Sequence, residues 1–291
     1  IIMALAFVHG FLFVNNYIIC KERNLRNFVH IIPILCGMIC CIFTSVRTDI
    51  LRLLSALIVC FCVMFFQQRN WKSNNLGKVI RKITPIILIC SILMVVVKNI
   101  VKGADSTTNQ AYNFIQYIAY YIGSPIVVLG IKNNMGVSMF KGQLFGETTL
   151  SGIWDILQNI GLFANYNIQN RSVNVWIDRG NRITANVDTV FGAPWIDFGL
   201  LGMFIYIFII YFLLNIYFFK YIYRTKSSNN RNRRLIIYSY FASICTMAYY
   251  GNMVSLYISS YYIITLILII IICRYYKIDK DIAPIDKDLR L

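Results

Sequence analysis

Charged side chains at one junction between two apolar runs are the first candidates for chemistry. Arg47, Asp49 and Arg52 lie close together in a chain of which only 14% is charged. Asp49 and Arg52 have the i,i+3 spacing of a pair on one helix face, which would be a structural role. Arg47 has no such local partner, so we take Arg47 as a candidate catalytic residue and Arg52 as a candidate substrate-binding residue.

Three further arginines, Arg171, Arg179 and Arg182, lie in a long segment that is less apolar than its flanks. A guanidinium group binds phosphate or carboxylate through two parallel hydrogen bonds. We therefore predict that at least one of the three binds an anionic part of a substrate. A solvated loop would carry the same charges without that function, and this alternative stays open.

Two carboxylates in the same region are candidates for a general base that acts on a hydroxyl group. Glu147 lies in the run GQLFGETT, and Asp197 lies in the run FGAPWIDFGLLG. Glu147 has no role evident from the sequence beyond local turn chemistry. Asp197 directly precedes a long apolar run, where it could instead cap the N-terminus of a helix. Both are candidate catalytic residues, and either could be the base.

The composition indicates which solvent surrounds these residues. The chain is 58% hydrophobic, its mean hydropathy is +0.62, and its apolar runs are long. In lipid the backbone must satisfy its hydrogen bonds within helices or a closed barrel, and long unbroken runs favour helices. The sequence therefore predicts an all-α polytopic integral membrane protein.

The expected spans divide the chain into four parts. A spanning helix needs about 20 mostly apolar residues, and about seven segments qualify. Residues 1–101 would hold four spans, 102–197 one large external loop, 198–273 three spans, and 274–291 a cytoplasmic tail. Because Ile1 already lies within an apolar run, we expect further segments before it. The spans are expected at 1–20, 28–46, 50–66, 83–101, 198–219, 235–254 and 256–273.

Lysine and arginine determine the expected orientation in the membrane. They collect in segments 21–27, 67–82 and 220–234 and at the start of the tail. Short loops rich in these residues face the cytoplasm, whereas long loops escape this rule. The turn at Arg47, the large loop and the turn near Gly251 would then all face the outer side. The candidate residues are thus expected on one face of the membrane.

Two helices are expected inside the large loop. Residues 112–131 suit a re-entrant or interfacial helix, because Gly123, Pro125 and several polar residues interrupt the apolar run. An eighth span is the alternative for this segment. Apolar residues from Ile153 to Phe163 recur at helical spacing, which predicts a short helix. That helix could lie along the membrane or pack onto the bundle.

The net charge of +16 could indicate nucleic acid, but positive loops and anionic lipid explain it. We therefore expect membrane lipid, and no nucleic acid, as a partner. Cysteines and histidines lie in or beside apolar runs without zinc-ligand spacing, so we expect no metal and no cofactor. Arginines could then replace a metal in stabilising a lipid pyrophosphate leaving group. One base and one displacement would invert the anomeric centre.

Several motifs occur in an order that resembles a known family. The run NVDT at 186–189, followed by FGAPWIDFGLLG at 191–202, resembles the signature N-V-x-T … D-F-G-x-x-G of bacterial oligosaccharide repeat-unit polymerases, the O-antigen and capsule polymerase family. TSVRT at 44–48 resembles the family's S-x-R turn at an outer helix junction. YIGSP at 121–125 resembles its segment early in the large external loop.

The resemblance implies an integral enzyme of the bacterial inner membrane. Such an enzyme transfers a growing glycan from undecaprenyl diphosphate onto the next lipid-linked repeat unit, outside the cytoplasm, with a flippase and a chain-length regulator as protein partners. By motif, the resemblance carries roles to Arg47, Asp197 and Thr189, the last as a substrate-binding residue. Glu147 and the loop arginines come from the charge pattern alone. The related O-antigen ligases have a histidine in the external loop, and this loop has none.

Two other functions stay open at this point. A lipid-linked oligosaccharide flippase or another polysaccharide transporter should show internal repeats and polar sites at the middle of the membrane. Here the polar groups gather near the expected outer interface, which favours chemistry at the surface. A scaffold in a polysaccharide export complex is the third reading, and it predicts that the external arginines are dispensable.

Overall fold

The structure is a computed structural model, in which the chain divides into two compact units. Unit 1 comprises Ile1–Gly103, Leu214–Ser243 and Ile264–Leu291, and unit 2 comprises Ala104–Leu213 and Ile244–Ile263. The residues that the structure describes are 1–43, 47–68, 71, 77, 81, 84, 114–136, 144–162, 175–178, 183–185, 189–223, 231–249, 251–276 and 278.

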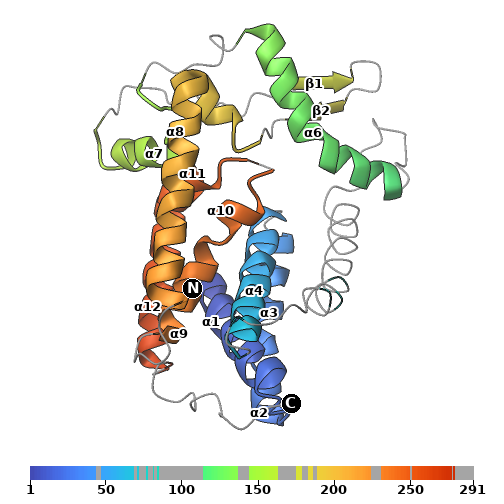
Figure 1. The fold of residues 1–291 in the computed structure, drawn as a ribbon, viewed down its shortest axis with the longest axis vertical. Coiled ribbons are helices and arrows are strands. Elements are labelled where there is room, and N and C mark those ends of the chain that lie inside the picture. Colours follow the sequence, from blue (N-terminus) through green and yellow to red (C-terminus); the bar gives the residue numbers. More distant parts are fainter. Residues whose placement is uncertain are drawn as a thin grey trace. The chain divides into compact units, whose positions relative to one another are not determined.

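All the secondary-structure elements described in unit 1 are helices (Figure 1). Its first helix continues without a break into a π-helix, and two further long helices follow. Segments from the C-terminal third of the chain complete the unit. The elements are α1 (Ile2–Leu12), η1 (Phe13–Ile19), α2 (Leu25–Phe28), α3 (Ile31–Phe43), α4 (Arg47–Gln68), η3 (Phe219–Tyr223), α9 (Arg231–Phe241) and most of α12 (Ser260–Tyr275).

Small residues allow the helices of unit 1 to pack closely. A Cβ atom at Gly10 of α1 would lie 2.4 Å from Cδ2 of Leu57 in α4, and one at Gly37 of α3 would lie 2.9 Å from Cβ of Ala6 in α1. Ala6 and Gly10 are one helical turn apart, as in the small-xxx-small pattern of membrane helix pairs. Glycine at these two positions therefore leaves room for side chains of the neighbouring helices, Leu57 at Gly10 and Ala6 at Gly37.

Unit 2 holds helices and one small hairpin (Figure 1). Strands β1 (Val175–Asp178) and β2 (Ile183–Ala185) pair antiparallel, with Val175 opposite Ala185. Helix α6 packs against this hairpin. The helices are α6 (Phe114–Met135), α7 (Ser151–Asn159), α8 (Gly192–Phe218), α10 (Ser243–Thr246) and α11 (Met253–Ile258); α8 and α10 each also contribute residues to unit 1.

Helix α8 changes direction at Gly199. The backbone of Gly199 has φ 70° and ψ −176°, which is outside helical geometry. The apolar stretch from Gly192 to Tyr223 has 32 residues, and at about 1.5 Å per residue it exceeds the apolar core of a bilayer, about 30 Å. The break separates a buried first segment, which contains Asp197, from an exposed apolar segment that begins at Leu200.

The helical character expected from the composition is confirmed. Among the described residues, four helices are long and apolar enough to cross a membrane, and all four coincide with expected spans. The hairpin β1–β2 is an element that the sequence did not predict. The four helices are Ile2–Ile19, Leu25–Phe43, Thr48–Gln67 and Gly192–Tyr223.

Three other expected spans have different outcomes. The span expected at 83–101 lies outside the described residues, apart from Thr84. The span expected at 256–273 corresponds to the shorter apolar helix Ser260–Tyr275. The prediction of a single helix at 235–254 was wrong, because this range contains the end of α9, all of α10, a turn and the start of α11.

The hydroxyl group of Ser239 lies just before the end of α9. The side chain of Ser239 donates a hydrogen bond to the carbonyl oxygen of Ile236 at 2.8 Å. The backbone N–H of Ala242 then bonds to the carbonyl oxygen of Ser239, three residues back, at 3.1 Å. Hydroxyl side chains that bond to nearby carbonyl groups compete with the regular helix pattern. The apolar run alone did not reveal this competition.

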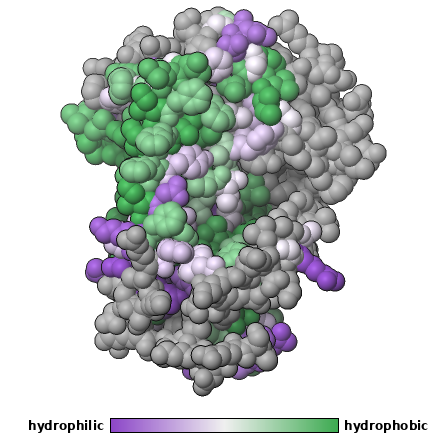
Figure 2. All heavy atoms as spheres, viewed as in Figure 1, coloured by the Kyte–Doolittle hydropathy of each residue, from purple (hydrophilic) through white to green (hydrophobic). Residues whose placement is uncertain are grey.

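Apolar side chains are exposed along α8 and α12. Leu201 is 75% exposed and Phe208 is 67% exposed. Figure 2 shows extensive green, hydrophobic surface among the described residues. A contiguous exposed apolar surface of this kind marks contact with lipid or with another apolar partner. The long apolar stretch Gly192–Tyr223, which is long enough to span, thus also carries a surface suited to a bilayer.

Candidate functional site

A tight turn places Glu147 inside unit 2. Gly146 has φ 63°, a left-handed conformation that glycine adopts without steric cost. The backbone N–H of Leu150 donates to the carbonyl oxygen of Gly146 at 2.7 Å, which closes the turn. Glu147 is only 1% exposed, and its Oε2 accepts a hydrogen bond from the backbone N–H of Leu144 at 3.1 Å. The Gly-Glu-Thr-Thr run therefore forms a compact turn around a buried carboxylate.

Asp197 binds the same turn from α8. Its Oδ2 accepts a hydrogen bond from the backbone N–H of Thr149 at 2.6 Å. Hydrogen bonds to an ionised carboxylate are shorter and stronger than neutral ones. Asp197 lies inside α8, which begins at Gly192, and not at the N-terminus of the helix. Its side chain therefore provides a hydrogen-bond acceptor for the backbone N–H of Thr149 in the turn. The structure thus brings the Glu147 turn and Asp197 together within unit 2.

The geometry explains why phenylalanine and two glycines follow Asp197. The ring of Phe198 lies 5.1 Å from that of Phe145, centroid to centroid, directly before the turn. Gly199 provides the positive φ of the kink in α8. A Cβ atom at Gly202 would lie 2.4 Å from Cβ of Phe198. The D-F-G-x-x-G pattern therefore has one structural effect. The carboxylate of Asp197 and the ring of Phe198 contact the turn, and the two glycines permit the backbone and side-chain positions that this requires.

Asn252 is a residue of this site that the sequence analysis did not identify. Its Nδ2 donates to the carbonyl oxygen of Thr149 at 3.0 Å. Its Oδ1 accepts from the hydroxyl of Tyr206 at 3.1 Å and from the backbone N–H of Val254 at 3.3 Å, which caps α11. Asp197 and Asn252 thus hold the N–H and C=O of Thr149. An asparagine directly before an apolar run is a helix-start signal, and that signal could have singled it out.

The short helix expected from Ile153 to Phe163 is confirmed as α7, with the bounds Ser151–Asn159, and it packs against α11. A Cβ atom at Gly152 would lie 2.3 Å from the carbonyl oxygen of Ser255. The hydroxyls of Ser151 and Ser255 are 2.6 Å apart, and the N–H of Gly152 donates to Oγ of Ser255 at 3.2 Å. Packing onto a neighbouring helix, one of the two arrangements considered for this segment, is therefore what the structure contains.

Thr189 lies before α8 and is buried. Its Oγ1 accepts a hydrogen bond from the backbone N–H of Phe191 at 3.3 Å, and its carbonyl oxygen accepts from Gly192 at 2.9 Å. The next residue, Val190, donates its N–H to the carbonyl oxygen of Ala248 at 2.7 Å. These bonds give Thr189 a turn-forming role at the start of α8. Its expected contact with substrate stays a prediction.

The pairing expected between Asp49 and Arg52 is confirmed in unit 1. Nη1 of Arg52 lies 3.0 Å from Oδ1 of Asp49, and the two side chains are 2% and 7% exposed. Buried ion pairs balance a large desolvation cost against mutual attraction, so losing one partner is costly. Arg47 is the first residue of α4 by its backbone. The substrate-binding role of Arg52 stays a prediction beside this structural role.

Other candidate residues lie outside the described part of the chain. These are Arg171, Arg179 and Arg182; the last two follow β1 and precede β2 in the sequence.

The segment expected to be re-entrant or interfacial is the single helix α6, which passes through Pro125. Among the described residues, no group of three His, Cys, Asp or Glu side chains could hold a metal ion.

The fold and the site define a class of protein: a helical membrane protein in which a buried carboxylate of a kinked helix binds a turn that contains a second buried carboxylate. The family described as "Putative O-antigen polymerase" matches residues 1–249, and the chain belongs to this family. Membership implies a role in polysaccharide biosynthesis and a polymerising glycosyltransferase type of activity. No curated protein and no solved structure matches the chain.

Proposed function

We propose that the protein polymerises undecaprenyl-diphosphate-linked oligosaccharide repeat units into O-antigen or a capsular or extracellular polysaccharide. The reaction would take place on the outer side of the bacterial inner membrane, where the large loop 102–197 would lie. The family match over residues 1–249 is the observation that carries this proposal. The concentration of lysine and arginine in the short loops on the opposite side supports the orientation.

In the proposed reaction, a hydroxyl oxygen of the acceptor repeat unit attacks the anomeric carbon of the donor glycan. The bond from that carbon to the diphosphate oxygen breaks, and undecaprenyl diphosphate leaves. The base takes the hydroxyl proton, and a single displacement of this kind inverts the anomeric centre. Arg47, Arg171, Arg179 and Arg182 would stabilise the charge that develops on the diphosphate.

Glu147 is the proposed base, and Asp197 is the proposed positioning residue. The 2.6 Å bond to the backbone of Thr149 already engages the carboxylate of Asp197. The hydroxyls of Thr148 and Thr149 are buried without a hydrogen-bond partner among the described residues. Buried polar groups in native proteins nearly always find a partner, so these hydroxyls support a polar ligand at the turn. Because Glu147 is 1% exposed, the turn must open for an acceptor hydroxyl to reach it.

A strain that lacks the protein tests the proposal. This strain should still make single repeat units on the lipid carrier, and its cell-surface glycan should carry single repeat units. Long polymer should be absent. Wild-type protein expressed from a plasmid should restore the polymer. Loss of single units from the outer surface, with accumulation inside, would instead indicate a flippase. Polymer of unchanged length in the null strain would exclude both functions.

A further inference from the structure

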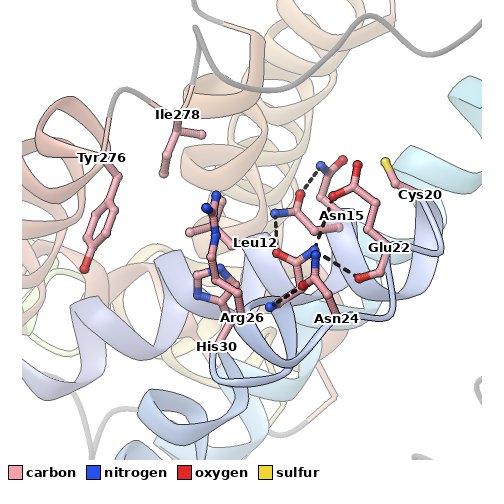
Figure 3. Close-up of a pocket in the computed structure, with 11 residues that line it drawn as sticks. Leu12, Asn15, Cys20, Glu22, Asn24, Arg26, His30, Tyr276 and Ile278 are labelled. Atoms are coloured by element: carbon pink, nitrogen blue, oxygen red, sulfur yellow. Dashed lines mark hydrogen bonds between the residues drawn. The ribbon is translucent and has the colours of Figure 1, made fainter.

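A polar cavity lies in unit 1, and none of the candidate site residues described above lines it. Its walls come from η1, from the segment between η1 and α3, and from the chain around the end of α12 (Figure 3). The cavity has a volume of about 410 Å³, within the range of sites that hold small molecules. A cavity with polar walls is unusual beside spans as apolar as Ile2–Ile19 and Leu25–Phe43.

Asparagine side chains bond to one another and shape one wall. Nδ2 of Asn15 donates to Oδ1 of Asn16 at 2.8 Å, and Nδ2 of Asn27 donates to Oε2 of Glu22 at 3.2 Å. The N–H of Asn27 also donates to Oδ1 of Asn24 at 2.8 Å. Figure 3 draws these bonds along one side of the cavity. The network holds the carboxylate of Glu22 in place at the wall.

The cavity carries one charge of each sign. Glu22 and Arg26 both line it, and within the described residues Arg26 makes no hydrogen bond or ion pair. The apolar part of the lining comes from Leu12, Tyr276 and Ile278. A ligand that fits must therefore pair a cation and an anion with an apolar part.

We propose that this cavity binds the headgroup of a zwitterionic phospholipid of the phosphoethanolamine type. The guanidinium group of Arg26 binds the phosphate, since its planar fork matches phosphate oxygens. The carboxylate of Glu22 binds the ammonium group, and the acyl chains begin beside Leu12, Tyr276 and Ile278. An anionic headgroup without an ammonium group would bring its phosphate near Glu22 with nothing to neutralise that carboxylate, which costs affinity.

The test measures lipid retention on the full-length protein by native mass spectrometry in detergent, with phosphatidylethanolamine and phosphatidylglycerol added at equal concentration. The wild-type protein should retain phosphatidylethanolamine preferentially. Arg26→Gln should weaken retention of both lipids at least about tenfold, the loss expected for hydrogen bonds to a charged group. Glu22→Gln keeps an oxygen acceptor for Asn27, and it should remove the preference for the ethanolamine headgroup.

Arg23→Gln is the matched control, because Arg23 lies in the same segment without lining the cavity. This variant should retain phosphatidylethanolamine as the wild type does, and thermal unfolding should show all three variants folded. Equal retention by the Arg26→Gln and Arg23→Gln variants would overturn the site. A wild-type preference for phosphatidylglycerol would overturn the headgroup assignment. Displacement of the lipid by free phosphoethanolamine at equal concentration would overturn the lipid as the ligand.

Discussion

The carboxylate of Asp197 accepts a 2.6 Å hydrogen bond from the backbone N–H of Thr149, a residue 48 positions earlier in the chain. This bond ties the kinked helix α8 to the turn that carries Glu147. It also assigns separate tasks to two acids that look alike in the sequence, since one holds the turn and the other lies within it. The first two predictions test that separation.

Asp197→Asn should keep much of the polymerising activity, within about tenfold of wild type, because the amide oxygen can still accept the bond from Thr149. Asp197→Ala leaves that buried N–H without a partner and should lower stability by about 1–3 kcal/mol. Polymer length on gels and thermal unfolding in detergent measure the two effects. An Asn variant that loses about 10²-fold or more while it stays folded would make Asp197 the base instead.

Glu147→Gln should lower the rate of polymerisation by about 10²-fold or more, since an amide cannot take the proton of the acceptor hydroxyl. Its oxygen can still accept the hydrogen bond from Leu144, so the turn should persist. Initial rates with purified lipid-linked repeat units, compared at equal protein level, provide the measurement. Rates near wild type would leave Glu147 with a turn-forming role only.

Arg47→Ala should abolish long polymer while the protein still inserts into the membrane. The variant loses a positive charge that stabilises the negative charge developing on the leaving diphosphate. Alanine variants of the loop arginines 171, 179 and 182 should weaken use of the donor. The matched controls are Lys78→Ala and Arg81→Ala, in the segment expected to face the cytoplasm. Surface polysaccharide profiles of each strain provide the comparison. Equal polymer in all of these strains would remove the role proposed for the arginines.

Asn252→Ala should lower both stability and rate, because Thr149 loses a donor, Tyr206 loses an acceptor and α11 loses its cap. The loss of stability should be about 1–2 kcal/mol. Asn252→Ser restores an acceptor for the cap but is too short to bond Thr149 as well. If Asn252 positions the turn, the Ser variant should regain stability yet keep a lowered kcat. Full recovery of kcat in the Ser variant would reduce Asn252 to a helix cap.

Arg52→Met should destabilise unit 1 by about 3–5 kcal/mol, since it leaves the carboxylate of Asp49 buried without its cation. The double change Asp49→Leu with Arg52→Met removes both charges and should recover most of that stability. Thermal unfolding in detergent follows the stability, and polymer length follows the function. A stable double variant without polymer would support substrate binding by Arg52. Normal polymer in that variant would leave the pair a purely structural role.

Local pattern determined much of this protein from sequence alone. The four helices long enough to span a membrane, helix α7 and the pair of Asp49 with Arg52 all follow from composition or from spacing within a few residues. Hydrophobicity and i,i+3 geometry are properties of neighbouring residues. Among the described residues, the single helix expected at 235–254 was not predicted correctly, and the hydroxyl of Ser239 bonds to the carbonyl oxygen of Ile236 just before α9 ends.

Only the tertiary structure decided which groups the two acids contact. The bond from Thr149 to Asp197 crosses 48 positions, and the bond from Asn252 to Thr149 crosses 103. No periodicity encodes such a meeting, because it depends on where whole helices pack and on what glycine permits at 199 and 202. Burial then makes each bond matter, since a polar group removed from water must find its partner within the fold.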